Sequence, residues 1–317
     1  LVLSACASAM LLYGFALIYA AAGELSYAGI GAKGAAAYAE NPMLIMAGSA
    51  MVLAGIGFKL SVAPFHMWTP DVYQGAPTPV TGFLATVSKG AVFVALSRFY
   101  IDGALYQYSG LNTALMVLAI TSMLVGNWLA LRQENIKRLL AYSSIAHFGY
   151  LLVVLIALTH LDAGLISQSI TFYLTAYILT TLAAFAVVST VAGEDPAKQD
   201  ISAFEGLFWH RPLEASALTV AMLSLAGIPL TAGFMAKFFV ITVGIQSGLW
   251  VLLAVLVVGS AVGIYYYLRV IFAMSKSTDG DGESANLLEN ILALALLAAI
   301  LVLGSWPQPF IAYAGGL

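Results

Sequence analysis

Long, uninterrupted apolar runs constrain this sequence more than any other feature. Most of them have the length of about 20 residues that an α-helix needs to cross the hydrocarbon core of a bilayer. The nine runs cover residues 1–22, 43–68, 79–101, 112–131, 135–158, 167–190, 213–245, 248–274 and 288–307. Only 9% of the residues are charged, against about 25% in a soluble domain. The sequence therefore predicts an all-α polytopic membrane protein of about nine transmembrane helices.

Several other classes of protein are excluded. The strands of a membrane barrel alternate polar and apolar residues over about ten positions, whereas these runs are continuous. The formal net charge of −3, without a basic patch, argues against a nucleic-acid partner. The sequence has no glycine-rich nucleotide loop, no Cys-x-x-Cys motif and no metal-ligand spacing. We therefore expect this chain to bind no cofactor and no metal, and its one cysteine, Cys6, to be a buried thiol.

Lysine and arginine are unequally distributed between the two sets of loops. One set, with the adjacent helix ends, holds Arg132, Lys137, Arg138, Lys198, Arg211, Arg269 and Lys276. The opposite set holds only Lys33 and Arg98. Because cytoplasmic loops are richer in these residues, we expect the start of the chain to be cytoplasmic and the C-terminus to lie on the outer face. The tyrosines at 265–267 and Trp306 are predicted to belong to an interfacial aromatic belt.

The ends and the loops of the chain lead to three further expectations. The sequence opens directly on an apolar span, without an initiator methionine or a signal peptide, which indicates a piece of a longer protein. The connection 191–212 carries mixed charges, and the connection 275–286 is acidic. Both are predicted to be solvated loops rather than binding sites.

Three lysines, Lys59, Lys89 and Lys237, fall inside the predicted spans. A lysine at the centre of a membrane helix costs roughly 2.5–3.5 kcal/mol on insertion scales. All fifteen carboxylates map to loops or span ends, so the sequence offers these cations no obvious acidic partner. One explanation is that the lysine stems extend along the apolar surface to the interface. The other is that the lysines face an internal hydrated path and carry protons along it.

Two prolines lie close to these lysines. Pro64 follows Lys59 by five residues, and Pro229 precedes Lys237 by eight. Proline breaks a helix, and a broken helix inside a membrane needs cover from protein or a water-filled cavity. A pair of discontinuous helices in corresponding halves is typical of a transporter site, although either proline alone is equally explained as a packing kink.

Two histidines lie near the same segments. His147 shares a helical face with Ser143 and Tyr150, at spacings of four and three residues. His66 follows Pro64 directly after Phe65. A histidine can relay protons near neutral pH, and the alternative is that each imidazole only satisfies a neighbouring carbonyl.

Six segments together resemble the antiporter-like subunit N family of bacterial respiratory complex I, the NADH-quinone oxidoreductase. They read GFKLSVAPFHMWTPDVYQGAPTPVTGFLATVSK, NIKRLLAYSSIAHFGYLL, LFWHRP, MLSLAGIPLTAGFMAKFFV, IYYYLRV and SWPQP. The resemblance implies an antiporter-like fold of inverted repeats with two discontinuous helices. This chain is similar to helices 6 to 14 of that fourteen-helix fold. Residues 1–101 then correspond to the rest of the first repeat, 112–274 to the second repeat, and 288–317 to the C-terminal helix.

The resemblance also implies a proton relay. Matched by motif, its lysines on helices 7, 8 and 12 are Lys59, Lys89 and Lys237, with His66 and His147 lining the path. The discontinuous helices 7 and 12 are those of Pro64 and Pro229. The family's glutamate on helix 5 lies outside this sequence, which accounts for the unpaired cations. A lysine on helix 12, without a long C-terminal lateral helix, favours subunit N over its sister subunits.

The implied function is that of a non-redox, proton-translocating subunit of NADH:quinone oxidoreductase. NADH, FMN, iron–sulfur clusters and quinone are then used by other subunits, and the lysine relay couples their chemistry to proton transfer. The implied partners are other membrane-arm subunits and the lipid bilayer of the bacterial inner membrane. The alternatives are a subunit of a multi-subunit cation/proton antiporter and a structural scaffold whose lysines have no role.

Overall fold

The computed structural model describes residues 2–193, 195–277 and 287–314, and its regular elements are helices. Eight of these helical segments are long and apolar enough to cross a membrane. They are α1 (Val2–Ala22), α3 (Pro42–Leu60), the composite segment Thr78–Asp102, α7 (Ser109–Ala130), α8 (Ile136–Ile156), α9 (Ala163–Ala192), α13 (Trp250–Ser275) and α14 (Leu287–Ser305). The predicted class is confirmed, and the chain is a multi-pass membrane protein.

Shorter helices complete the fold. The predicted run 213–245 is divided into α11 (Pro212–Ala226) and α12 (Ala232–Gln246). The composite segment consists of α5 (Thr78–Phe83), a π-helical turn (Leu84–Ser88) and α6 (Lys89–Asp102). The others are α2 (Tyr27–Glu40), α4 (Trp68–Gly75), α10 (Leu207–His210), α15 (Gln308–Ala314) and the 3₁₀ turns Leu105–Gln107, Ala157–Thr159, Pro196–Gln199 and Ile201–Phe204.

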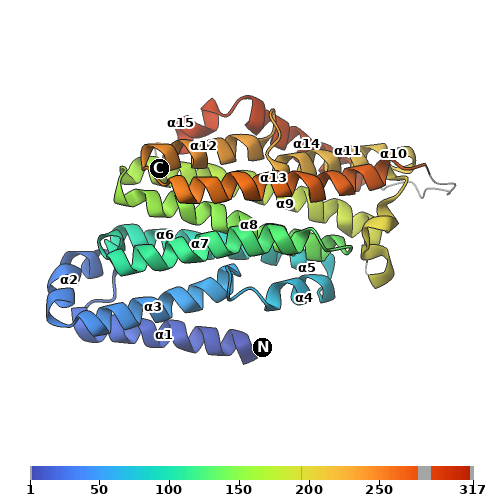
Figure 1. Cartoon of the computed structure of the whole chain (residues 1–317). Helices are drawn as coiled ribbons and strands as arrows, with labels where there is room; N and C mark the ends of the chain where they lie inside the picture. Colours follow the sequence, from blue (N-terminus) through green and yellow to red (C-terminus); the bar gives the residue numbers. More distant parts are fainter. Residues whose placement is uncertain (1, 194, 278–286, 315–317) are drawn as a thin grey trace.

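Helix α8 forms the centre of the molecule. It lies between α1–α3 on one side and α11–α14 on the other (Figure 1), and it contacts α4, α7, α9, α12 and α13. Within α8 only Arg138 and Tyr142 are not buried. A helix that is apolar on all sides is expected in such a position. The polar side chains that α8 does carry are thereby placed inside the bundle.

Both predicted interruptions occur, but each helix stops before its proline. Helix α3 ends at Leu60, and Ser61 takes the left-handed backbone conformation (φ 63°). Helix α11 ends at Ala226, and Gly227 takes the same conformation (φ 84°). Pro64 and Pro229 lie in the non-helical links 61–67 and 227–231. The breaks are therefore made by helix C-termini, and the prolines occupy the links that follow.

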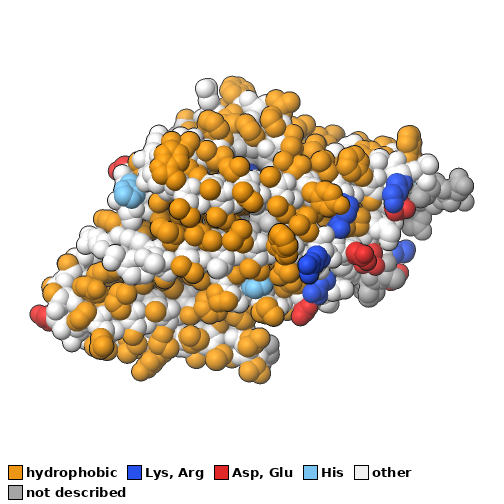
Figure 2. Space-filling model, in the orientation of Figure 1, with side chains coloured by type: hydrophobic (Ala, Val, Ile, Leu, Met, Phe, Trp, Pro, Cys, Tyr) orange, Lys and Arg blue, Asp and Glu red, His pale blue; other side chains and the backbone are white. Residues whose placement is uncertain are grey.

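Charged residues gather at one end of the molecule. Figure 2 shows most of the Lys, Arg, Asp and Glu side chains on the visible face at the end where α10 lies, whereas the rest of that face is largely apolar. The loops at 131–135 and 195–211 meet there, joined by the bridge between Asn135 and Asp200. This asymmetry agrees with the unequal loop charges, and the cytoplasmic assignment of this end stays a prediction.

Two expectations about surface positions are wrong. Cys6 is exposed, because α1 turns only the face of Ala7, Gly14, Ile18 and Ala22 inward. Tyr265 and Trp306 are exposed, but Tyr266 and Tyr267 are each only 1% exposed. Successive helical residues point about 100° apart, so three in a row cannot all face an interfacial belt.

The loop predictions need correction as well. The connection after α9 is not simply solvated, because Ile201, Phe204 and Leu207 are buried there. Of the acidic connection 275–286, residues 278–286 lie outside the described part. Between the first two predicted spans, the alanine-rich segment Tyr27–Glu40 forms α2, and the hydroxyl of Ser26 caps it by accepting from Gly29 N at 3.1 Å.

Glycines allow α1 and α3 to pack closely. A Cβ atom added to Gly14 lies 2.6 Å from Gly48 O, and one added to Gly55 lies 2.7 Å from Ala7 O. Small residues that let two backbones approach are a common basis for helix association in membranes.

We therefore expect Gly14→Ala to lower stability by about 1–3 kcal/mol, because the new methyl group meets backbone atoms that cannot rotate away. The measurement is the thermal unfolding midpoint of the purified protein in detergent. Gly75→Ala is the matched control, since an added Cβ there meets no heavy atom within 4 Å. Equal midpoints for the two variants would contradict the packing argument.

Candidate functional site

The bundle interior holds three of the five predicted relay residues close to α8. Lys89, His147 and Lys237 are 2%, 5% and 7% exposed. Lys89 comes from α6, His147 from α8 itself and Lys237 from α12. Within the described residues, none of the three forms an ion pair with a carboxylate.

Lys89 is held by a hydroxyl group and two aromatic rings. Its Nζ donates to Ser144 Oγ at 2.7 Å, and it lies 5.3 Å from the ring centroid of Tyr73 and 5.5 Å from that of Phe148. The π-helical turn Leu84–Ser88 directly precedes it, and such turns are frequent at functional sites. Neutral dipoles and ring faces thus stabilise the ammonium group.

Lys237 is held by the end of a helix. Its Nζ donates to the carbonyl oxygen of Ala226 at 2.8 Å, and Ala226 is the last residue of α11. The C-terminal carbonyls of a helix carry partial negative charge and favour a cation. Gly227 makes this contact possible, because a Cβ atom there lies 2.8 Å from Lys237 Cδ. The ammonium also lies 5.4 Å from the ring centroid of Tyr150.

His147 is joined to hydroxyl groups through both ring nitrogens. Nδ1 lies 2.8 Å from the hydroxyl of Tyr173, and Nε2 lies 3.4 Å from that of Tyr267. The Tyr267 hydroxyl also makes a hydrogen bond to Ser143. Because each hydroxyl can donate or accept, this imidazole can gain a proton on one nitrogen and release one from the other.

A small cavity lies between His147 and the second break. It has a volume of about 10 Å³ and is lined by His147, Tyr173, Thr180 and Ser224 among others, which is close to the room that one water molecule needs. Thr180 Oγ1 and Ser224 Oγ are 2.9 Å apart, and Gly233 N donates to Ser224 Oγ at 3.0 Å. The cavity also contacts Ala236, the neighbour of Lys237 in the chain.

Lys59 and His66 lie apart from this group, at the first break. Lys59 is half-buried and borders an open pocket of about 690 Å³ that also contacts Ser88, the residue before Lys89. In the described part of the chain, its ammonium has neither a hydrogen bond nor an ion pair. The Asp71 carboxylate, which lines the same pocket, pairs instead with Arg138, whose Nη1 lies 2.6 Å from Asp71 Oδ1. His66 is 7% exposed, and its Nδ1 has no partner among the described residues.

A third fully buried lysine, Lys137, was not predicted to lie in the interior. The sequence placed it at the start of the predicted span 135–158, among the loop and interface cations, whereas it is 0% exposed in the first turn of α8. Its Nζ donates to Ala76 O at the end of α4 at 2.7 Å. Asn135 caps this helix by accepting from the backbone N–H groups of Lys137 and Arg138. Asn immediately before Ile-Lys-Arg is a helix-start signal, and it agrees with the predicted start of this span at residue 135.

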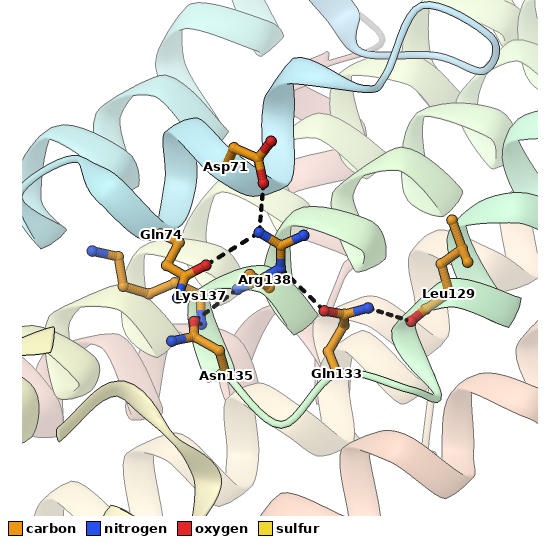
Figure 3. A network of polar contacts seen from close by, with 7 residues as sticks. All are labelled: Asp71, Gln74, Leu129, Gln133, Asn135, Lys137 and Arg138. Atoms are coloured by element: carbon orange, nitrogen blue, oxygen red, sulfur yellow. Dashed lines mark hydrogen bonds and ion pairs between the residues drawn. The ribbon is translucent and has the colours of Figure 1, made fainter. Parts of the chain in front are cut away.

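Arg138 makes a second attachment to α4. Figure 3 shows its guanidinium group between Asp71, Gln74 and Gln133, with donor–acceptor distances of 2.6, 3.1 and 3.2 Å. The first turn of α8 therefore holds α4 at two points. Because α4 carries Tyr73, this attachment also positions one wall of the Lys89 site.

Comparisons with known proteins agree on one family. The family model described as "NADH:quinone oxidoreductase/Mrp antiporter, TM" matches residues 1–263. The chain is 49% identical over 314 residues to the NADH-quinone oxidoreductase subunit N of Methylococcus capsulatus (strain Bath), and the alignment covers 98% of this chain and 63% of that protein.

Chains of three solved membrane complexes share this fold. A chain of respiratory complex I from Thermus thermophilus superposes with a TM-score of 0.84 at 38% identity, over 98% of this chain and 66% of that chain. A chain of an archaeal membrane-bound sulfane sulfur reductase gives 0.84 at 29% identity, over 99% and 64%. A chain of the Mrp complex from Dietzia sp. gives 0.83 at 21% identity, over 99% and 65%, which shows a shared fold. The chain thus spans just under two thirds of the length of these relatives.

The α4 attachment leads to a test by amide hydrogen exchange. Lys137→Met retains the bulk of the side chain but removes the donor to Ala76 O, so we expect exchange in residues 68–76 to accelerate by roughly tenfold or more. Lys33→Met is the control, since Lys33 is 56% exposed and pairs with Glu24 elsewhere. Unchanged exchange in α4 would show that Lys137 does not hold it.

Proposed function

This chain belongs to the NADH:quinone oxidoreductase/Mrp antiporter transmembrane family, and we propose that it is the proton-translocating subunit N of a bacterial NADH-quinone oxidoreductase. The relative named subunit N, identical at 49% of the aligned positions, supports this assignment over other members of the family. The observation that carries it is the pair Lys89 and Lys237, two ammonium groups inside a membrane protein with only neutral acceptors among the described residues.

The proposed path runs along α8. Lys89 delivers its proton toward Ser144 Oγ, to which it is already hydrogen-bonded. His147 lies one turn further along α8 and exchanges protons through its two tyrosine hydroxyls. The small cavity beside His147, with room for one water, continues the path toward the break that carries Lys237. The hydroxyl and imidazole groups along this path can each accept and donate a proton in turn.

Electrostatic repulsion couples the two lysines of this path. Two positive charges inside the same weakly polarisable interior repel each other strongly. Protonation of one lysine therefore promotes release from the other. The Ala226 carbonyl holds Lys237 in its charged state, so that a change at Lys89 or at a neighbouring subunit is needed to release its proton.

We assign Lys59 to the entrance of the relay. The family resemblance supplies a glutamate from a preceding helix as its acidic partner. The pocket of about 690 Å³ beside Lys59 offers space for that carboxylate. His66, at the same break, lines this part of the path in the proposal. Withdrawal of the glutamate would favour proton transfer from Lys59 toward Lys89.

Redox chemistry belongs to other subunits in this proposal. NADH, FMN, iron–sulfur clusters and quinone are used elsewhere in the complex, and the energy reaches this subunit through its membrane-arm neighbours. The chain lies in the bacterial inner membrane, with its C-terminus on the periplasmic side, as the loop charges favour. It acts as a translocase subunit of the enzyme.

The second candidate is a subunit of a multi-subunit cation/proton antiporter, because the same fold occurs in the Mrp complex. The two functions are separated by the partners that co-purify with the chain. Flavin-containing and iron–sulfur subunits support the redox-driven pump. Co-purification with a sodium-responsive assembly that lacks redox centres would instead support the antiporter.

The relay is tested by Lys237→Met in the intact complex. We expect proton pumping by reconstituted vesicles to fall by roughly tenfold or more, because the relay loses a proton-carrying group. Lys59→Met is expected to act in the same direction. The exposed Lys33→Met is the control, and undiminished pumping by an intact complex with Lys237→Met would refute the assignment.

A gentler substitution tests the helix-end contact. Gly227→Ala places a methyl group against the Lys237 stem, whereas Gly248→Ala imposes comparable backbone strain (φ 84° and 67°) with no heavy atom closer than 4.0 Å. We expect Gly227→Ala to reduce pumping several-fold relative to Gly248→Ala, measured per assembled complex. A similar loss of pumping in both variants would show that backbone strain alone causes the effect.

A further inference from the structure

A pocket at the charged end of the molecule is separate from the proton path. It has a volume of about 580 Å³ and lies between the last turns of α13 and the loops around Glu134 and Asp200. Lys276, the residue after α13, lines the pocket too, and α13 itself contributes Tyr265, Leu268, Arg269 and Phe272 among others. Their spacing of three or four residues places them along one face of the helix.

The lining of this pocket combines exposed aromatic surface with charged groups. Tyr265 and Phe272 are 64% and 65% exposed, and they contribute aromatic surface to it. Lys276, directly after the end of α13, reaches the loops and pairs with Glu205 at 2.6 Å. The indole of Trp209 donates to Ser275 O nearby, as expected of a tryptophan at headgroup level. Apolar surface beside charged groups matches the two parts of an amphiphile.

The charges of the pocket have both signs. Arg269 donates to the carbonyls of Leu131 and Gln133, and its buried Nε has no hydrogen-bond partner within the described residues. Glu134 and Asp200 line the same pocket, are exposed, and form no ion pair in the described part of the chain. Since Lys276 and Glu205 neutralise each other, one cation and two carboxylates remain to interact with a ligand.

We infer that this pocket binds a zwitterionic phospholipid whose headgroup ends in a primary amine. The phosphate lies by Arg269, the ammonium group donates to Glu134 and Asp200, and an acyl chain covers Tyr265 and Phe272. An anionic headgroup is disfavoured, because it offers nothing to the two carboxylates and is repelled by them. A quaternary ammonium headgroup fits less well, because it lacks N–H donors for the carboxylates.

Photo-crosslinking of the intact complex tests this site. The complex is placed in phosphatidylcholine nanodiscs with a trace of phosphatidylethanolamine that carries a photoreactive acyl chain. We expect labelling of the α13 segment 265–276. Unlabelled phosphatidylethanolamine should compete more effectively than phosphatidylcholine or phosphatidylglycerol.

The double variant Glu134→Gln/Asp200→Asn should reduce labelling by roughly threefold to tenfold, as expected when exposed charge contacts of this kind are lost. Glu24→Gln is the matched control, a partly exposed carboxylate paired with Lys33 outside this pocket. The variants are compared at equal thermal stability. Equal labelling by all three lipid classes, unchanged labelling of the double variant, or crosslinking of this pocket to protein alone would each overturn the inference.

Discussion

The structure depends on how positive charge is accommodated in an apolar interior. Removing an ion from water costs several kcal/mol even after relaxation. Lys89, Lys137 and Lys237 meet this cost without a carboxylate among the described residues, through a serine hydroxyl and two backbone carbonyls. Neutral acceptors hold an ammonium group less firmly than an ion pair does. That weaker hold suits the proton release that we propose for Lys89 and Lys237.

Helix α8 and the two helix breaks together supply the groups that form these sites. Helix α8 supplies Ser144 to Lys89, presents His147 to its tyrosines, and fixes α4 through Lys137 and Arg138. The breaks expose carbonyl groups that a continuous helix would keep in its own ladder. The Ala226 carbonyl reaches Lys237 for that reason.

The sequence was sufficient for the membrane class, the apolar spans and the lysines within them, because hydrophobic length and intramembrane charge are local properties. It did not reveal Tyr173 and Tyr267 as partners of His147, since those contacts join residues 26 and 120 positions apart. The burial of Lys137 was missed because its contact with Ala76 joins residues 61 positions apart. Cys6 and the tyrosines at 266 and 267 were misplaced because composition does not say which face of a helix turns inward.

The burial of α8 has a consequence for biogenesis. The span Ile136–Thr159, which consists of α8 and the turn after it, has a mean hydropathy of 1.9, equal to that of α1, although its apolar window is 94% buried and that of α1 only 17%. Helices α9, α12 and α13, which enclose α8, follow it in the chain. During synthesis α8 therefore enters the bilayer before these neighbours exist and must first be stable in lipid. The insertion of α8 into the membrane, rather than its packing in the finished bundle, limits how many polar groups this central helix can carry.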